Sequence, residues 1–307
     1  MFFRRSVASR DGIKWKRTIK KAFVALMLLA TVSLIVLTYY ELRGRNSVER
    51  RQLRYLFESG SFEAAFIQSS QMLKENPLDS FLLTIHGFSA FQLAVAQINA
   101  FDTLFYIDES IWSLRKALLL RENSSNGRIF YVLGKAYFYK GSGYADLAVR
   151  YLEKAWPLHM ASDIPEYLGL AHAALQDYRS SVAAFSLALT SEPSDLLLLS
   201  IARSYLALGE KDAAKAYLMR CLEISRDSKL ITTSRLLLGG ILASAGDLSG
   251  AEREFLKVLE QNGEHSEAFF QLGELYAMSG DIARARAEWR RALRVDPTHS
   301  LARSRLN

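Results

Sequence analysis

A pattern that recurs along the chain constrains its fold more than any other feature. A leucine followed by a glycine occurs four times in one register, at Leu133-Gly134, Leu168-Gly169, Leu238-Gly239 and Leu272-Gly273. A given pair of residues falls on a fixed position by chance roughly once in a hundred times. Four pairs in register therefore indicate an internal repeat. The period of this repeat lies within the range of about 20–50 residues that is typical of repeat proteins. Such a period predicts an array of stacked units, because one unit cannot bury its apolar face alone.

The last copy of the repeat shows what each unit contains. Between Phe269 and Pro297, large and small residues follow the spacing of two consecutive helices. Small residues belong where two antiparallel helices cross closely, large ones fill the space between them, and a proline ends the second helix. The residues that carry this pattern are Phe269, Leu272, Gly273, Tyr276, Ala285, Trp289, Ala292 and Pro297.

These residues closely resemble the tetratricopeptide (TPR) pattern. The same frame recurs in units that start near residues 46, 80, 127, 162, 195, 232 and 266. The resemblance implies an all-α fold, a TPR-like right-handed α-solenoid of about seven helix pairs over residues 46–299. A short C-terminal tail, 300–307, follows the last unit.

The second unit is longer than the others. Its spacing to the next unit is 47 residues, and the extra residues centre on 93–109. This segment is apolar and aromatic, which favours longer helices over a loose loop. Two interpretations stay open, namely that the insertion packs onto a neighbouring unit or that it forms a ridge for a partner.

A second feature lies ahead of the repeats. Residues 22–40 form a run of 19 residues without a charge, a proline or a glycine. As a helix the run would span about 28 Å, close to the hydrocarbon thickness of a bilayer. We therefore predict a basic N-terminal tail over 1–21, a transmembrane helix over 22–40 and a linker over 41–45. An uncleaved signal anchor is favoured over a cleaved signal peptide, because charged residues follow the run without an obvious cleavage site.

The charge distribution bears on topology. The chain carries a net charge of +7, but residues 1–45 alone hold ten basic and two acidic residues. The remaining 29 basic and 30 acidic residues leave the repeats nearly neutral. The basic tail favours a cytoplasmic N-terminus in the inner (cytoplasmic) membrane, with the array in an extracytoplasmic or periplasmic space. The alternative is a cytoplasmic array, because several arginines also follow the apolar run.

The sequence also bears on chemistry. A neutral array argues against nucleic acid as a partner. The single cysteine, Cys221, excludes a disulfide within the chain and a multi-thiolate metal site. The histidines are scattered, and metalloprotease, nucleophile-elbow and P-loop motifs are missing from the sequence. We therefore expect no catalytic site, no metal and no cofactor.

The resemblance places the candidate binding surface on the concave side of the array, where the first helix of each pair lies. The TPR positions that line this groove fall on aromatic, basic and apolar residues, namely Phe88, Phe91, Arg128, Tyr131, Lys135, Phe138, Tyr139, Leu170, Leu199 and Arg203. Such a surface suits a peptide or helix with apolar anchors and some acidic character.

The expected function is that of a membrane-anchored, non-enzymatic scaffold or assembly factor of a cell-envelope complex. Self-association through the C-terminal unit is a further expectation. The alternative is a chaperone-like holdase for exported or unfolded polypeptides. The lysine and asparagine clamp of chaperone-tail TPR proteins is incomplete, and the CxxC module of some envelope-assembly TPR proteins is missing.

Overall fold

The computed structural model describes residues 47–97, 99–120, 125–158, 161–189 and 193–307. The predicted basic tail, transmembrane helix and linker lie outside these residues. Within them, every regular element is helical, as the repeats predict. Across the same residues, no helix combines the length and the apolar character needed to cross a bilayer.

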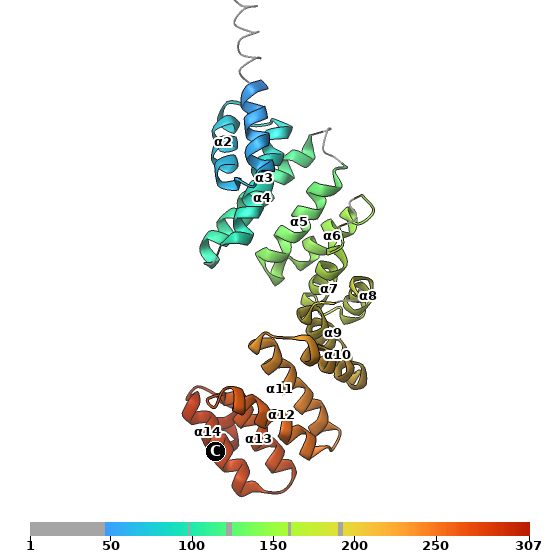
Figure 1. Cartoon of the computed structure of the whole chain (residues 1–307), viewed down its shortest axis with the longest axis vertical. Helices are drawn as coiled ribbons and strands as arrows, with labels where there is room; N and C mark the ends of the chain where they lie inside the picture. Colours follow the sequence, from blue (N-terminus) through green and yellow to red (C-terminus); the bar gives the residue numbers. More distant parts are fainter. Residues whose placement is uncertain (1–46, 98, 121–124, 159–160, 190–192) are drawn as a thin grey trace, which may run out of the picture.

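The described residues form seven consecutive helix pairs and a final short helix. Each helix packs on the next along the chain, and Figure 1 shows the pairs following one another in an elongated array. A helix over 47–58 pairs with α2 (Phe62–Glu75), α3 (Ser80–Ala96) with α4 (Ala100–Leu119), α5 (Gly127–Lys140) with α6 (Ala145–Ala155), α7 (Ile164–Ala174) with α8 (Tyr178–Ala188), α9 (Asp195–Ala207) with α10 (Lys211–Ile224), α11 (Ser228–Ser244) with α12 (Leu248–Gln261), and α13 (Ser266–Met278) with α14 (Ile282–Val295), before α15 (Ser300–Leu306).

The repeated glycine marks the closest approach within a pair. A Cβ on Gly273 of α13 would lie 2.4 Å from Cδ1 of Trp289 and 3.1 Å from the carbonyl oxygen of Ala285 on α14. A Cβ on Gly169 of α7 would lie 2.4 Å from Cδ1 of Phe185 on α8. These distances leave no room for a side chain, so the glycine is needed for the two helices to pack.

The turn inside a pair is also set by local chemistry. Gly246 adopts a φ of 84°, a left-handed conformation that glycine reaches without strain. The carboxylate of Asp247 then accepts a 2.8 Å hydrogen bond from the backbone N–H of Gly250 and caps α12. The sequence Gly-Asp therefore ends one helix and starts the next.

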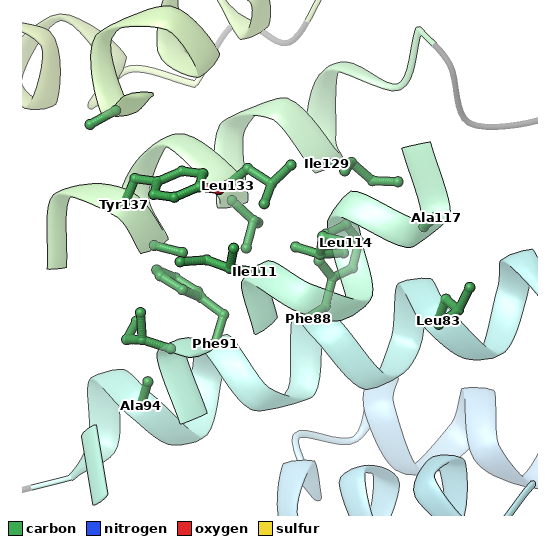
Figure 2. Close-up of a cluster of buried hydrophobic side chains, with 14 of the residues drawn as sticks. Leu83, Phe88, Phe91, Ala94, Ile111, Leu114, Ala117, Ile129, Leu133 and Tyr137 are labelled. Carbon is green, nitrogen blue, oxygen red and sulfur yellow. The ribbon is translucent and has the colours of Figure 1, made fainter. Parts of the chain in front are cut away.

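The largest apolar cluster lies between the second and third pairs. Figure 2 shows that it draws on α3 through Phe88 and Phe91, on α4 through Ile111 and Leu114, and on α5 through Leu133. Leu114 and Leu133 are fully buried. Burial of these side chains joins the two pairs, which is how a solenoid stabilises units that are not stable alone.

Residues 93–109 fall at the junction of two long helices. They continue α3 as far as Ala96 and form the first half of α4. Ile107 is buried in the cluster of Figure 2, while Phe101 and Phe105 of the same segment are exposed. The segment thus both packs on its neighbours and leaves an apolar surface open.

The C-terminal residues form a short helix rather than a bare tail. The helix α15 packs on α14, and Ala302 is buried beside Trp289 and Ala292. The guanidinium of Arg305 binds Glu274 of α13 at 2.6 and 2.9 Å. The last pair is therefore partly covered by the chain itself.

Candidate partner-binding groove

The first helices of neighbouring pairs border a hollow of about 480 Å³. It lies between α3, α5 and α7, with one residue from the helix over 47–58. Its lining is mostly aromatic and consists of Phe57, Phe88, Phe91, Gln92, Val95, Arg128, Tyr131, Val132, Lys135, Tyr139 and Tyr167. We call this surface the groove.

The floor of the groove is formed by two phenylalanines of α3. Phe88 and Phe91 are only 6% and 5% exposed. The ring of Phe91 meets the ring of Tyr139 edge to face, with 6.1 Å between centroids. The floor is therefore an apolar surface fixed by packing rather than a row of mobile side chains.

A polar network crosses the groove from α5 to the residue before α7. The Nζ atom of Lys135 lies 2.9 Å from Oδ2 of Asp163 and 3.1 Å from the hydroxyl of Tyr131. That hydroxyl also donates to Asp163, with 2.8 and 2.9 Å to the two carboxylate oxygens. The three side chains hold each other in one arrangement and link the third helix pair to the fourth.

Protonation in this network follows from burial and hydrogen bonding. Burial raises the pKa of the Tyr131 phenol, so the hydroxyl stays protonated. Burial alone would lower the pKa of Lys135, but its hydrogen bonds to Asp163 and Tyr131 raise it overall. The site is therefore an ammonium paired with a carboxylate, not a proton-transfer pair poised near neutral pH.

Two tyrosines form the far rim of the groove. The hydroxyls of Tyr139 on α5 and Tyr167 on α7 lie 3.0 Å apart. Burial, followed by this hydrogen bond, raises the pKa of Tyr139 to about 12. The Lys135 ammonium lies 4.3 Å from the ring centroid of Tyr167, a cation–π distance. The rim thus presents neutral hydroxyl groups beside aromatic faces.

Arg128 lies at the opposite side. Its guanidinium stacks over the ring of Phe88, 5.3 Å from the centroid. Arg128, Phe57, Phe88 and Gln92 also border a second hollow of about 510 Å³, between α3 and the helix over 47–58. The two hollows therefore lie next to each other, and Arg128 is on their common border.

The structure brings six of the ten predicted groove residues together, Phe88, Phe91, Arg128, Tyr131, Lys135 and Tyr139. Phe138 packs edge to face on the ring of Tyr167 instead. Leu170 lies with the apolar cluster around Phe185, and Arg203 is exposed on α9, in the pair after α7. The prediction for Leu199 is wrong, because its side chain is 1% exposed and packs with Leu238 and Ile241 of α11.

Several residues of the groove were missed. Phe57 lies at the same repeat position as Phe91, so the pattern could have identified it. Asp163 is the second residue of its unit, as Arg128 is of the preceding unit, so the pattern could have identified it too. Tyr167 precedes Leu170, the predicted groove residue of its unit, by three residues, and the pattern does not identify it, because its contact is made with α5 of the preceding pair.

The described residues contain no group of three or more histidine, cysteine, aspartate or glutamate side chains that could hold a metal ion. Cys221 is buried, and its thiol lies 3.3 Å from the carbonyl oxygen of Asp195. Burial raises the pKa of this thiol, which makes it a weak nucleophile.

Comparison with known families agrees with the helix pairs. Residues 197–228, which cover most of α9 and α10, match a model of the tetratricopeptide repeat. Residues 266–299, which cover α13 and α14, match a second one. No curated protein matches the chain.

Solved structures share the fold at low sequence identity. The C-terminal part of a TPR repeat-containing protein from Cytophaga hutchinsonii aligns with a TM-score of 0.61 and 16% identity, over 84% of this chain and 99% of that one. PilW, described as a widely conserved type IV pilus biogenesis factor, aligns at 0.57 and 18%, over 72% and 98%. YrrB, described as a TPR protein with an unusual peptide-binding site, aligns at 0.51 and 23%, over 62% and 96%. The fold is therefore that of tetratricopeptide-repeat structures, and the helix pairs α9–α10 and α13–α14 also match sequence models of that repeat.

Proposed function

We propose that this protein is a non-enzymatic, membrane-anchored scaffold or assembly factor of a cell-envelope complex, and that it holds a segment of a partner protein in the groove. The observation that carries the proposal is the groove with its apolar floor and aromatic rim, together with the second hollow that adjoins it. Its open form suits a polypeptide segment that runs along it better than an enclosed small molecule.

The chemistry of the lining specifies the segment. Aromatic side chains and arginine contribute most to binding at protein interfaces. Because the charge of Lys135 is already balanced by Asp163, the cations available to a partner are Arg128, which borders both hollows, and Arg54, which borders the second. The segment we propose therefore places an apolar side chain on Phe88 and Phe91 and a carboxylate beside Arg128.

The groove is also ordered before a partner arrives. The hydrogen bonds among Tyr131, Lys135 and Asp163 fix side chains that would otherwise lose rotamer freedom on binding. Each such side chain would cost about 0.5–1.5 kcal/mol to immobilise. Preorganisation thus favours a specific segment over a sequence-tolerant surface, and favours the scaffold over the holdase.

Anchoring rests on the sequence of residues 22–40 and the basic residues before it. We propose that this segment holds the array at the inner membrane, on its extracytoplasmic side. Reporter fusions at the C-terminus, one active only in the cytoplasm and one active only outside it, decide the side. Activity of the cytoplasmic reporter alone would overturn that placement.

Cross-linking in native membranes tests the groove. A photo-reactive amino acid replaces Gln92, which is exposed and borders both hollows, and a matched control replaces Glu260 on the outer surface of α12. We expect one predominant partner from position 92 and none from position 260. Arg128→Glu is expected to reduce capture at least tenfold, whereas Arg253→Glu on the outer surface of α12 leaves it unchanged.

The same cross-linking experiment distinguishes a specific scaffold from a chaperone-like holdase. Many different captured chains, together with suppressed aggregation of unfolded proteins, would support the holdase. Equal capture from positions 92 and 260, or capture that ignores Arg128→Glu, would contradict binding in the groove. The specific scaffold requires one stoichiometric partner whose capture depends on Arg128.

A further inference from the structure

The outer face of α4 carries a stripe of exposed apolar side chains. The exposed fractions are 83% for Phe101, 51% for Phe105, 53% for Trp112 and 85% for Leu119. Together with Asp108 and Arg115, these residues follow spacings of four, three, four, three and four. That spacing places the six residues, four apolar and two charged, along the one face of a helix that can pack along another helix.

Other outer helices of the array show what a solvated face contains. On α12 the exposed residues include Arg253, Lys257 and Glu260. On α14 they include Arg286, Arg290 and Arg294. These faces also expose single apolar side chains, such as Leu256 at 41% and Ile282 at 52%, whereas α4 exposes four large ones along one face. Scattered surface residues do not explain such a stripe.

The stripe combines a protrusion and a hollow on one helix. A hollow of about 460 Å³ lies beside its C-terminal half, lined by Asp108, Ile111, Trp112, Arg115, Lys116, Leu119 and Lys140. Phe101 and Phe105 are exposed in its N-terminal half, and that half of α4 lies at the free end of the α3–α4 hairpin in Figure 1. A surface that carries both shapes at opposite ends is complementary to itself when one copy is turned around.

The charges follow the same polarity. Asp102 and Asp108 lie in the N-terminal half of α4, where Asp108 is already paired with Lys140 of α5 at 2.7 Å, and Arg115 and Lys116 lie in the C-terminal half. In one chain the Lys116 ammonium lies over the Trp112 ring, 3.4 Å from the centroid. An antiparallel pair of α4 helices places acidic ends opposite basic ends, whereas a parallel pair places like charges together.

We propose that two copies of this chain associate through antiparallel packing of their α4 helices. In this register Phe101 of one copy meets Leu119 of the second, Phe105 meets Arg115, and Asp108 meets Trp112. The phenylalanines of each copy thereby enter the hollow of the other. The twofold axis passes near position 110, and the contact extends over about 27 Å of helix. The grooves, lined by α3, α5 and α7, stay open to partners.

Cysteine cross-linking in the full chain tests both the contact and its direction. Cys221 is buried, so introduced surface cysteines are the reactive ones. Two differently tagged copies are expressed together, one with Phe105→Cys and one with Arg115→Cys, and mild oxidation follows. We expect a mixed-tag dimer in at least a tenfold higher yield than from two Phe105→Cys copies, whose positions would lie about 15 Å apart along the axis. Asp108→Cys with Trp112→Cys is the second pair and tests the contact if one variant of the first pair folds poorly. It does not test the direction, because two Asp108→Cys copies would lie only about 6 Å apart along the axis.

Controls decide the other outcomes. Copies with Arg253→Cys and Glu260→Cys on α12 are expected to give no dimer above background. Adding Trp112→Glu to the first pair is expected to abolish its cross-link. Strong cross-linking between two Phe105→Cys copies would overturn the antiparallel arrangement. Self-association would be overturned if neither pair gave a cross-link. The same holds if only lipid vesicles or a different protein shielded the introduced thiols from modification.

Discussion

The Lys135 ammonium lies 2.9 Å from the Asp163 carboxylate, across the boundary between the third and fourth helix pairs. Lys135 is largely buried and Asp163 is partly exposed. The pair therefore stabilises the stacking of two units and shapes the groove at the same time. Removing this ion pair should therefore lower both the stability of the fold and the affinity of the groove for a partner.

Asp163→Ala removes the only carboxylate bonded to the Lys135 side chain among the described residues, and leaves that ammonium in a half-buried site. We expect a loss of about 1–3 kcal/mol in the free energy of unfolding, measured by urea denaturation. Adding Lys135→Met should recover part of the loss. The control is Arg284→Ala, which breaks an ion pair whose arginine side chain is 68% exposed and should cost under about 0.5 kcal/mol. Equal losses in the two single variants would contradict the role of burial.

Two adjacent glycines in α11 make a matched pair. A Cβ on Gly239 would lie 2.4 Å from Cε1 of Phe255, whereas a Cβ on Gly240 meets nothing within 4 Å. We expect Gly239→Ala to destabilise the protein by about 1–3 kcal/mol through overpacking. Gly240→Ala should stabilise it by up to about 1 kcal/mol, because alanine favours a helix more than glycine does. Thermal unfolding of the two variants measures the contrast, and a shift of the same sign in both would refute the packing argument.

His86 of α3 makes stability depend on pH. The ring is almost fully buried, stacks on Phe66, and lies 2.9 Å from the Ser69 hydroxyl and 3.4 Å from the Glu109 carboxylate. Burial lowers the pKa of the imidazole, and the interaction with Glu109 only partly opposes this. As the pH falls through the ordinary histidine pKa of about 6.5, the unfolded chain takes up the proton first.

Folding stability should therefore decrease as the pH falls from 7.5 to 5. His86→Asn keeps a polar side chain at this position but cannot titrate, so its urea midpoint should decrease less over the same range. The carboxylates and the other histidines titrate in both proteins, so the difference between the two pH profiles gives the contribution of His86 to stability. If Glu109 and not burial controlled the imidazole, its pKa would be raised, and wild type would lose less stability than His86→Asn as the pH falls. Parallel profiles would show that the two effects cancel, and either result would contradict the prediction.

Sequence periodicity predicted the helices because their packing is local to each unit. Gly239 and Gly273 occupy equivalent positions, and each faces a large ring on the second helix of its own pair. The groove was predicted less completely because its contacts join different units. Asp163 reaches Lys135 across a unit boundary, and the repeat pattern of one unit says nothing about such a pairing.

Leu199 shows the same limit from the other side. It occupies the repeat position of Tyr131, which lines the groove, yet it is buried against α11. The position of a residue in the repeat determines on which face of its own helix the side chain lies. Whether that face is open depends on how closely the next pair stacks, and this depends on side chains of both units.

Deletion of residues 300–307 tests how far stability is shared along the array. The helix α15 covers Ala292 and Trp289 through Ala302, and Arg305 binds Glu274. In a solenoid each unit contacts only its neighbours, so the effect of the deletion should be confined to the end of the array. We expect amide hydrogen exchange to quicken at least tenfold in α13 and α14 and to stay unchanged in α5. The control Arg305→Ala removes the ion pair alone and should have a much smaller effect, because its guanidinium is half exposed. Faster exchange in α5 would mean that the array unfolds as one cooperative unit, and unchanged exchange in α14 would mean that α15 contributes no cover.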